Sequence, residues 1–67
     1  MANQQVIGER LRELRGLKKR EVVAAAVGIS ASALAMYESG RRVPRDEIKV
    51  RLAQYYNVSI ESIFYAA

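Results

Sequence analysis

Two short helical patterns that meet at one glycine constrain the fold of this chain more than any other feature. They lie in the stretch REVVAAAVGISASALAMYES and predict one helix over residues 20–27 and a second over residues 31–38. At about 100° per residue, each pattern places its apolar residues on one face. These residues are Val23, Ala24 and Val27 in the first helix and Ala33, Leu34 and Tyr37 in the second. The two faces are therefore expected to pack against each other and against the core.

The corner Gly28–Ile29–Ser30 predicts a sharp turn between these two helices. Gly28 follows the last apolar residue of the first helix, where a glycine can take the left-handed conformation that ends a helix. Ser30 stands directly before the second helix, where its oxygen can cap a free N–H group. Ala24 lies where the helices are expected to cross, and its small side chain permits a close approach.

Helical patterns in the rest of the chain predict an all-α fold in a single domain, residues 1–67. Further helices are expected over residues 6–15, 45–56 and 60–64. Their apolar residues are Ile7, Leu11 and Leu14, then Ile48, Leu52 and Tyr56, and finally Ile60, Ile63 and Phe64. Pro44 suits the first turn of the helix over 45–56, because its missing N–H is not needed there. Ser59 is expected to cap the last helix, and the polar residues 1–5 are expected to fray.

The composition excludes several classes of protein. The 67 residues include no cysteine and no histidine, so disulfides, thiolate metal sites and serine–histidine triads are not expected. Acidic residues occur, but no nucleophile and base stand together, so we expect no enzyme, no metal and no cofactor. The longest apolar run, residues 22–27, is far shorter than the roughly 20 residues of a membrane span. No signal peptide is visible, so a cytoplasmic protein without a membrane partner is expected.

The charge of the chain favours a polyanionic partner. Eleven basic and seven acidic residues give a net charge of +4. The basic residues gather at the two ends of the stretch 20–39, as Lys18–Lys19–Arg20 before it and as Arg41, Arg42 and Arg45 after it. A solvated surface is the alternative interpretation of such runs.

The residues in and after this stretch resemble those of the phage repressor and Cro family, also called the xenobiotic response element (XRE) family of helix-turn-helix regulators. The resemblance covers about residues 7–64. It is carried by Ala24, Gly28, Ile29, Ser30, Leu34, the run Tyr37–Glu38–Ser39–Gly40–Arg41–Arg42, and Pro44. It implies a compact five-helix, lambda-repressor-like fold with the helix-turn-helix at residues 20–39. It also implies a transcriptional regulator, most often a repressor, that places the helix over 31–38 in the major groove of double-stranded DNA.

The resemblance implies that four residues of the helix over 31–38 face the DNA bases: Ala31, Ser32, Ala35 and Met36. None of the four is a long hydrogen-bonding side chain, and serine discriminates weakly between bases. We therefore expect a site containing thymine that is read by methyl packing and by DNA shape. Met36 has an alternative role as a filler of the core or as a dimer contact.

Affinity is then expected to come mainly from contacts to phosphates or to the minor groove. The candidates are Lys19, Arg20, Ser30, Arg41, Arg42 and Arg45. Lys19 and Arg20 depart from the family, which commonly has Ser or Thr and then Gln at these two positions. Lys49 and Arg51, on the outer face of the helix over 45–56, are expected to be solvated.

Two further roles follow from the resemblance. It implies an ion pair between Arg15 and Glu38, for which the alternative is a solvated arginine. It also implies a homodimer on a palindromic operator with half-sites roughly 34 Å apart. Two surfaces are candidates for the dimer contact: the segment with Ile60 and Tyr65, and the region around Val43 and Val50. Either Ile63 or Phe64 is expected to be buried within the monomer. No small-molecule effector is evident.

A second class of function stays open at this point. An antitoxin-like or coactivator-like module, whose main partner is another protein, can share this fold. An apolar patch without a basic face would favour that function. Here the basic residues coincide with the helix expected to face DNA, which favours DNA binding.

Overall fold

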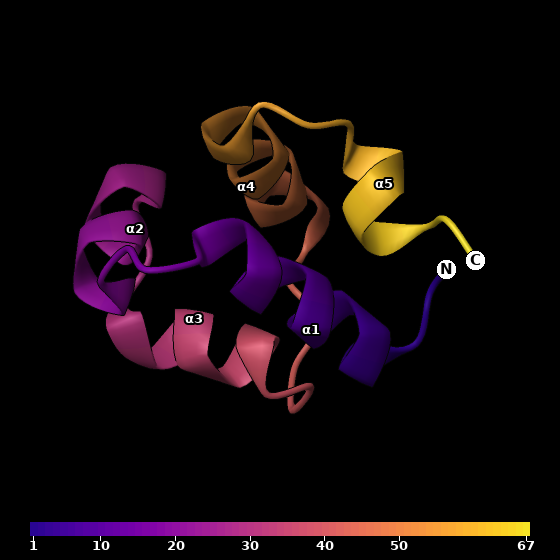
Figure 1. The fold of residues 1–67 in the computed structure, drawn as a ribbon, viewed down its shortest axis with the longest axis horizontal. Coiled ribbons are helices and arrows are strands. Elements are labelled where there is room, and N and C mark those ends of the chain that lie inside the picture. The colour runs from indigo at the N-terminus through magenta and orange to yellow at the C-terminus, as the bar shows by residue number, and fades with distance from the viewer.

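The computed structural model describes residues 1–67 and contains five α-helices and no strands (Figure 1). The helices are α1 (Gln4–Arg15), α2 (Arg20–Val27), α3 (Ala31–Glu38), α4 (Asp46–Tyr56) and α5 (Ile60–Phe64). The predicted all-α, five-helix fold is confirmed, and the bounds of α2, α3 and α5 are those that the sequence predicts.

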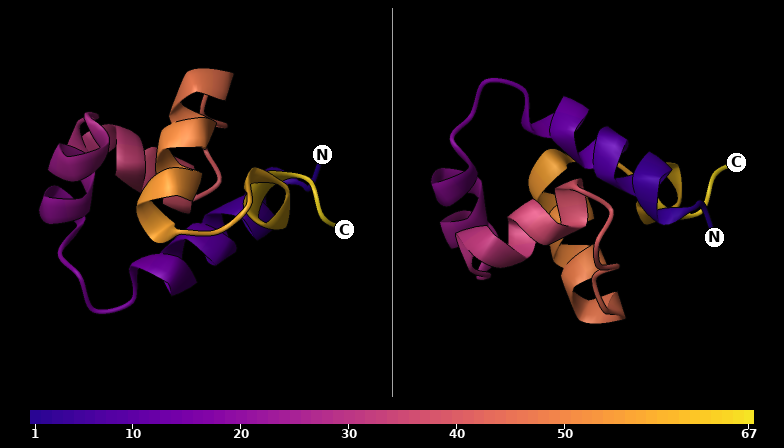
Figure 2. Two further views of the ribbon diagram at one scale, coloured as in Figure 1. Left: turned by 90° about the horizontal axis from the view of Figure 1, so that it is seen from above. Right: turned by 90° about the horizontal axis from the view of Figure 1, so that it is seen from below.

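The helices enclose one core. Helix α1 packs against α3 and α5, α2 packs against α3 and α4, and α4 packs against α5. Seen from below, α4 lies behind α1 and α3, and the two chain ends lie together beside α5 (Figure 2). The core consists of Ile7, Leu11, Val23, Ala24, Val27, Leu34, Tyr37, Ile48, Leu52, Ala53, Ile63 and Phe64. Both Ile63 and Phe64 are buried, where at least one was expected.

The amino terminus is not frayed from residue 2 onward, so the prediction for residues 1–5 is wrong there. The Asn3 side chain accepts a hydrogen bond from the Val6 N–H at 2.9 Å and starts α1 at Gln4. The Ala2 N–H donates to the Phe64 carbonyl at 2.9 Å. The cap and this bond to the end of α5 satisfy backbone groups that a frayed end would leave to water.

The start of α4 also differs from the prediction. Arg45 is the residue before the helix, in an extended conformation, and α4 begins at Asp46. Pro44 therefore lies outside the first turn, and its side chain is buried. The proline fixes the approach of the chain to α4 and contributes apolar surface there.

Lys49 is buried, which contradicts its predicted place on a solvated face. Only 6% of its surface is exposed. Its ammonium group donates to the Tyr65 hydroxyl at 3.0 Å and lies 3.6 Å from the Asp46 carboxylate. It also lies 4.9 Å from the centre of the Tyr65 ring. A wheel drawn for α4 alone cannot show this burial, because the covering residue follows α5.

No single helix is long and apolar enough to cross a membrane. Helices α2 and α3 reach the length and composition of a span only when taken together, and they are bent by 107° at the break between them.

Candidate nucleic-acid interface

The corner between α2 and α3 has the geometry that the sequence predicts. Gly28 is left-handed, with φ of 85°, and its N–H donates to the Ala24 carbonyl at 2.9 Å. The Ser30 hydroxyl accepts a hydrogen bond from the Ala33 N–H at 3.0 Å and caps α3. The 107° bend between the helices lies in the range of about 90–120° that is typical of a helix-turn-helix.

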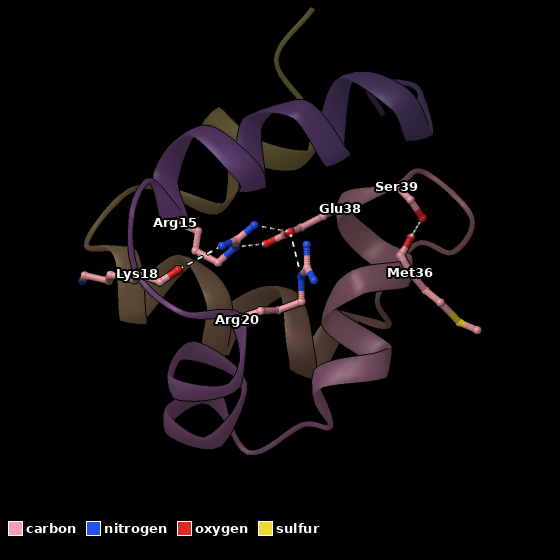
Figure 3. A network of polar contacts seen from close by, with 6 residues as sticks. All are labelled: Arg15, Lys18, Arg20, Met36, Glu38 and Ser39. Carbon is pink, nitrogen blue, oxygen red and sulfur yellow. Dashed lines mark hydrogen bonds and ion pairs between the residues drawn. The ribbon is translucent and has the colours of Figure 1, made fainter.

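Helix α3 presents a mainly apolar face to the outside. Leu34, Tyr37 and Glu38 point inward and are buried. Of the four residues predicted to face the bases, Ser32 and Met36 are exposed and Ala31 and Ala35 are half-buried. The Met36 side chain extends away from the other helices (Figure 3). This face is therefore open to a partner and offers methyl groups, one thioether and one hydroxyl.

Basic side chains flank this face. Lys19, Arg41, Arg42 and Arg45 are exposed, as is Ser30, so each can reach a partner. Arg20 is only half-exposed, because its guanidinium is bound to Glu38. An open cleft of about 530 Å³ lies between the corner, α3 and the start of α4. The arginines in its lining are Arg42, Arg45 and Arg51.

The carbonyl of Met36 holds the arginine-containing loop against the end of α3. It accepts hydrogen bonds from the Arg41 N–H at 3.0 Å and from the Arg42 N–H at 3.4 Å. It also accepts one from the Ser39 hydroxyl at 3.2 Å, which Figure 3 shows. The backbone of Arg41 and Arg42 is thereby fixed relative to the outward face of α3. Their side chains start from defined positions although they are exposed.

The end of α3 is tied to α1 by the ion pair that the family resemblance implied. Arg15 donates from Nε to Glu38 Oε2 at 2.7 Å and from Nη2 to Oε1 at 3.0 Å (Figure 3). The Arg15 Nη1 group donates to the Lys18 carbonyl at 2.9 Å. Glu38 is 2% exposed, and its hydrogen bonds raise the pKa of the Arg15 guanidinium, although burial alone would lower it. This network ties the end of α3 to the end of α1 and to the connection between α1 and α2.

Tyr56 places an unpaired hydroxyl inside the protein, which the sequence did not reveal. The hydroxyl oxygen is buried and has no hydrogen-bond partner. Burial, reinforced by the negative charge of Glu38, raises the pKa of Tyr56 to about 12 from its ordinary value of 10.0. A buried hydroxyl without a partner destabilises the folded state.

Replacing Tyr56 with phenylalanine should therefore raise the free energy of unfolding at pH 7 by about 1 kcal/mol. The raised pKa means that the folded state keeps the tyrosine proton at a pH where the unfolded state loses it. The free energy of unfolding of the wild type should therefore fall more steeply than that of Y56F as the pH rises from 10.0 to about 12. Urea unfolding at pH 7 and at pH 11 tests both statements. A variant that is less stable at pH 7 would show that the hydroxyl has a partner.

The residues predicted for a dimer contact are partly exposed but not free of internal roles. Val43 and Ile60 are half-buried, and Ile60 packs at the edge of the core. Tyr65 is exposed, with its hydroxyl taken by Lys49. Val50 is exposed on α4. The dimer surface stays a prediction.

Comparison with known proteins identifies close likenesses. A family model described as "Helix-turn-helix" matches residues 9–63. A comparison with curated proteins gave no match. Among solved structures, the chain is similar to the restriction-modification controller protein C.AhdI from Aeromonas hydrophila, with a TM-score of 0.82 and 28% identity. That alignment covers 91% of this chain and 96% of the controller protein.

The chain is also similar to the c2 repressor of phage P22, solved in complex with a synthetic operator, with a TM-score of 0.84 and 28% identity. That alignment covers 94% of this chain and 98% of the repressor. The LexA repressor from Eubacterium rectale aligns with a TM-score of 0.82 at 22% identity and covers 94% of this chain and 72% of LexA. At that identity the likeness to LexA shows the fold alone.

Proposed function

Because this chain belongs to the helix-turn-helix family and is a DNA-binding transcriptional regulator, we propose that it acts as a repressor that inserts α3 into the major groove of duplex DNA. One observation carries the proposal. The outward face of α3 exposes Ser32 and Met36, with Ala31 and Ala35 half-buried beside them, and basic side chains flank it at the start of α2 and in the loop before α4.

The base-facing residues are Ala31, Ser32, Ala35 and Met36. Three of these side chains can make only apolar contacts with base edges, and those contacts favour thymine methyl groups. We therefore propose an operator that is read mainly through thymine methyl groups and through DNA shape.

The phosphates and the minor groove are contacted by Lys19, Arg20, Ser30, Arg41, Arg42 and Arg45. These contacts supply affinity and register, and they carry no direct sequence information. The loop bonds to the Met36 carbonyl support this role for Arg41 and Arg42, because they fix the loop backbone beside α3.

The proposal includes a homodimer on a palindromic operator, with the contact made near Val43, Ile60 or Tyr65. A second copy doubles the contact area that one small domain offers and sets the half-site spacing. We propose that the protein acts in the cytoplasm, without an enzyme activity, a cofactor or a small-molecule effector.

Selection of bound duplexes from a random DNA pool, repeated at two salt concentrations, tests the function. An enriched, two-fold symmetric and T-containing site is expected, with weaker binding at higher salt. A pool without enrichment, competed equally by any duplex, would favour a protein as the main partner.

Substitutions at Met36 and Arg42 should separate base reading from phosphate binding. Met36→Ala should alter the selected sequence, because the thioether is the longest side chain on the outward face. Arg42→Ala should weaken binding to all sequences alike and lower the slope of log K against log salt by about one. Repeated selection and salt titration measure the two effects. An unchanged sequence preference in the Met36 variant would contradict the assignment of this face.

A further inference from the structure

The half-exposed Arg20 is held by a buried carboxylate, unlike the exposed arginines of the loop after α3. Its Nε group donates to Glu38 Oε1 at 3.2 Å, and this is its only hydrogen bond within the protein. Arg41, Arg42 and Arg45 in the loop after α3 have no such side-chain anchor. Arg20 reaches from the start of α2 to the end of α3, beside Arg15 (Figure 3).

The bonding of Glu38 leaves the outer half of the Arg20 guanidinium free. Arg15 already makes two hydrogen bonds to the Glu38 carboxylate, at 2.7 and 3.0 Å, and so neutralises it. With two cations on one anion, a positive charge remains in excess. The Arg20 side chain is 40% exposed, whereas that of Glu38 is 2% exposed, so the excess charge lies on the solvent side.

We propose that Glu38 is a positioning residue that aims the Nη groups of Arg20 at a DNA phosphate. A guanidinium whose inner nitrogen is bound presents its two outer nitrogens as a fixed fork, which matches the geometry of a phosphate. The fixed fork loses less rotamer freedom on binding than a mobile side chain loses. This inference rests on the proposed function, since it assigns a phosphate contact to a DNA-bound α2–α3 unit.

The inference predicts that charge alone cannot replace Arg20. A lysine at this position has a single ammonium group without a planar fork, and Glu38 would hold that group at the carboxylate and away from the phosphate. Arg20→Lys and Arg20→Gln should therefore both weaken binding by about tenfold. Both should also lower the salt slope by about 0.9, the value for one lost phosphate contact.

The experiment measures binding of a labelled duplex, taken from the selected pool, by anisotropy across a salt series. Arg12→Gln is the matched control, because Arg12 is an exposed arginine of α1. It should leave both affinity and slope nearly unchanged. Thermal unfolding of each variant checks that the fold is retained.

A Glu38→Gln background tests the positioning role directly. If E38Q remains folded at low temperature, E38Q and the double variant E38Q/R20K should bind the duplex with about equal affinity. Without the Glu38 carboxylate, neither side chain at position 20 is held in a fixed orientation. If E38Q does not fold, the affinities and salt slopes of R20K, R20Q and R12Q still test whether the arginine fork is needed.

Wild-type binding by R20K would overturn the inference, since a mobile charge would then be enough. If the wild-type protein bound no duplex at all, the proposed function would be overturned together with the inference. If R42A lost affinity while R20K and R20Q bound like the wild type, only the inference would be overturned.

Discussion

Gly8→Ala should unfold much of the protein, lowering the free energy of unfolding by about 3 kcal/mol or more. Helix propensity alone predicts the opposite sign, a gain of about 1 kcal/mol, because alanine is the better helix former. The structure reverses this expectation. A β-carbon on Gly8 would overlap the Glu38 carbonyl oxygen and would lie 2.8 Å from the Glu38 carbonyl carbon and 3.0 Å from the Tyr37 oxygen. These are backbone atoms, so α1 and α3 would have to separate.

Gly16→Ala is the control for this prediction. Gly16 ends α1 with φ of 57°, and its added β-carbon would meet only the Glu13 oxygen, at 3.8 Å. Its cost should be backbone strain alone, on the order of 1–3 kcal/mol, without any separation of helices. Urea unfolding followed by circular dichroism measures both variants. A Gly8 variant that is as stable as the Gly16 variant would show that α1 and α3 can move apart at little cost.

The sequence was sufficient where the local pattern and the packing agree. The bounds of α2 and α3 follow from one glycine, one serine cap and two apolar stripes, and the tertiary structure changes none of them. The Arg15–Glu38 pair came from the family resemblance. Periodicity alone gives no information about a partner 23 positions away.

What the sequence did not reveal depends on contacts between distant segments. From the sequence, Lys49 is expected to be solvated, but in the structure Tyr65 covers it. Gly8 is expected only to weaken its helix, but in the structure the backbone of α3 lies directly against it. A glycine in the middle of a strong helical pattern was the available signal, because it costs stability without a local reason. Asn3 was a similar signal for the start of α1, as a cap residue directly before the helix.

Arg15→Met is the second substitution with a large expected effect. It should lower the free energy of unfolding by about 3 kcal/mol, because it leaves the buried Glu38 carboxylate without its main partner. Arg20 keeps one hydrogen bond to Glu38, which places the cost at the lower end of the range for a broken buried pair. Arg12→Met removes an exposed arginine from the same turn of α1 and should change stability by less than about 0.5 kcal/mol.

The double variant Arg15→Met/Glu38→Met separates the value of the pair from the cost of breaking it. With both charges gone, the site holds apolar groups of similar volume, and most of the lost stability should return. Arg20 can then turn to solvent, since its side chain is already 40% exposed. Equilibrium unfolding of the two variants gives the comparison. If the single variant were as stable as the wild type, Glu38 would have to reach water on its own, and the end of α3 would be free to move away from α1. In that case the fixed geometry that the proposed phosphate contact of Arg20 needs would also be lost.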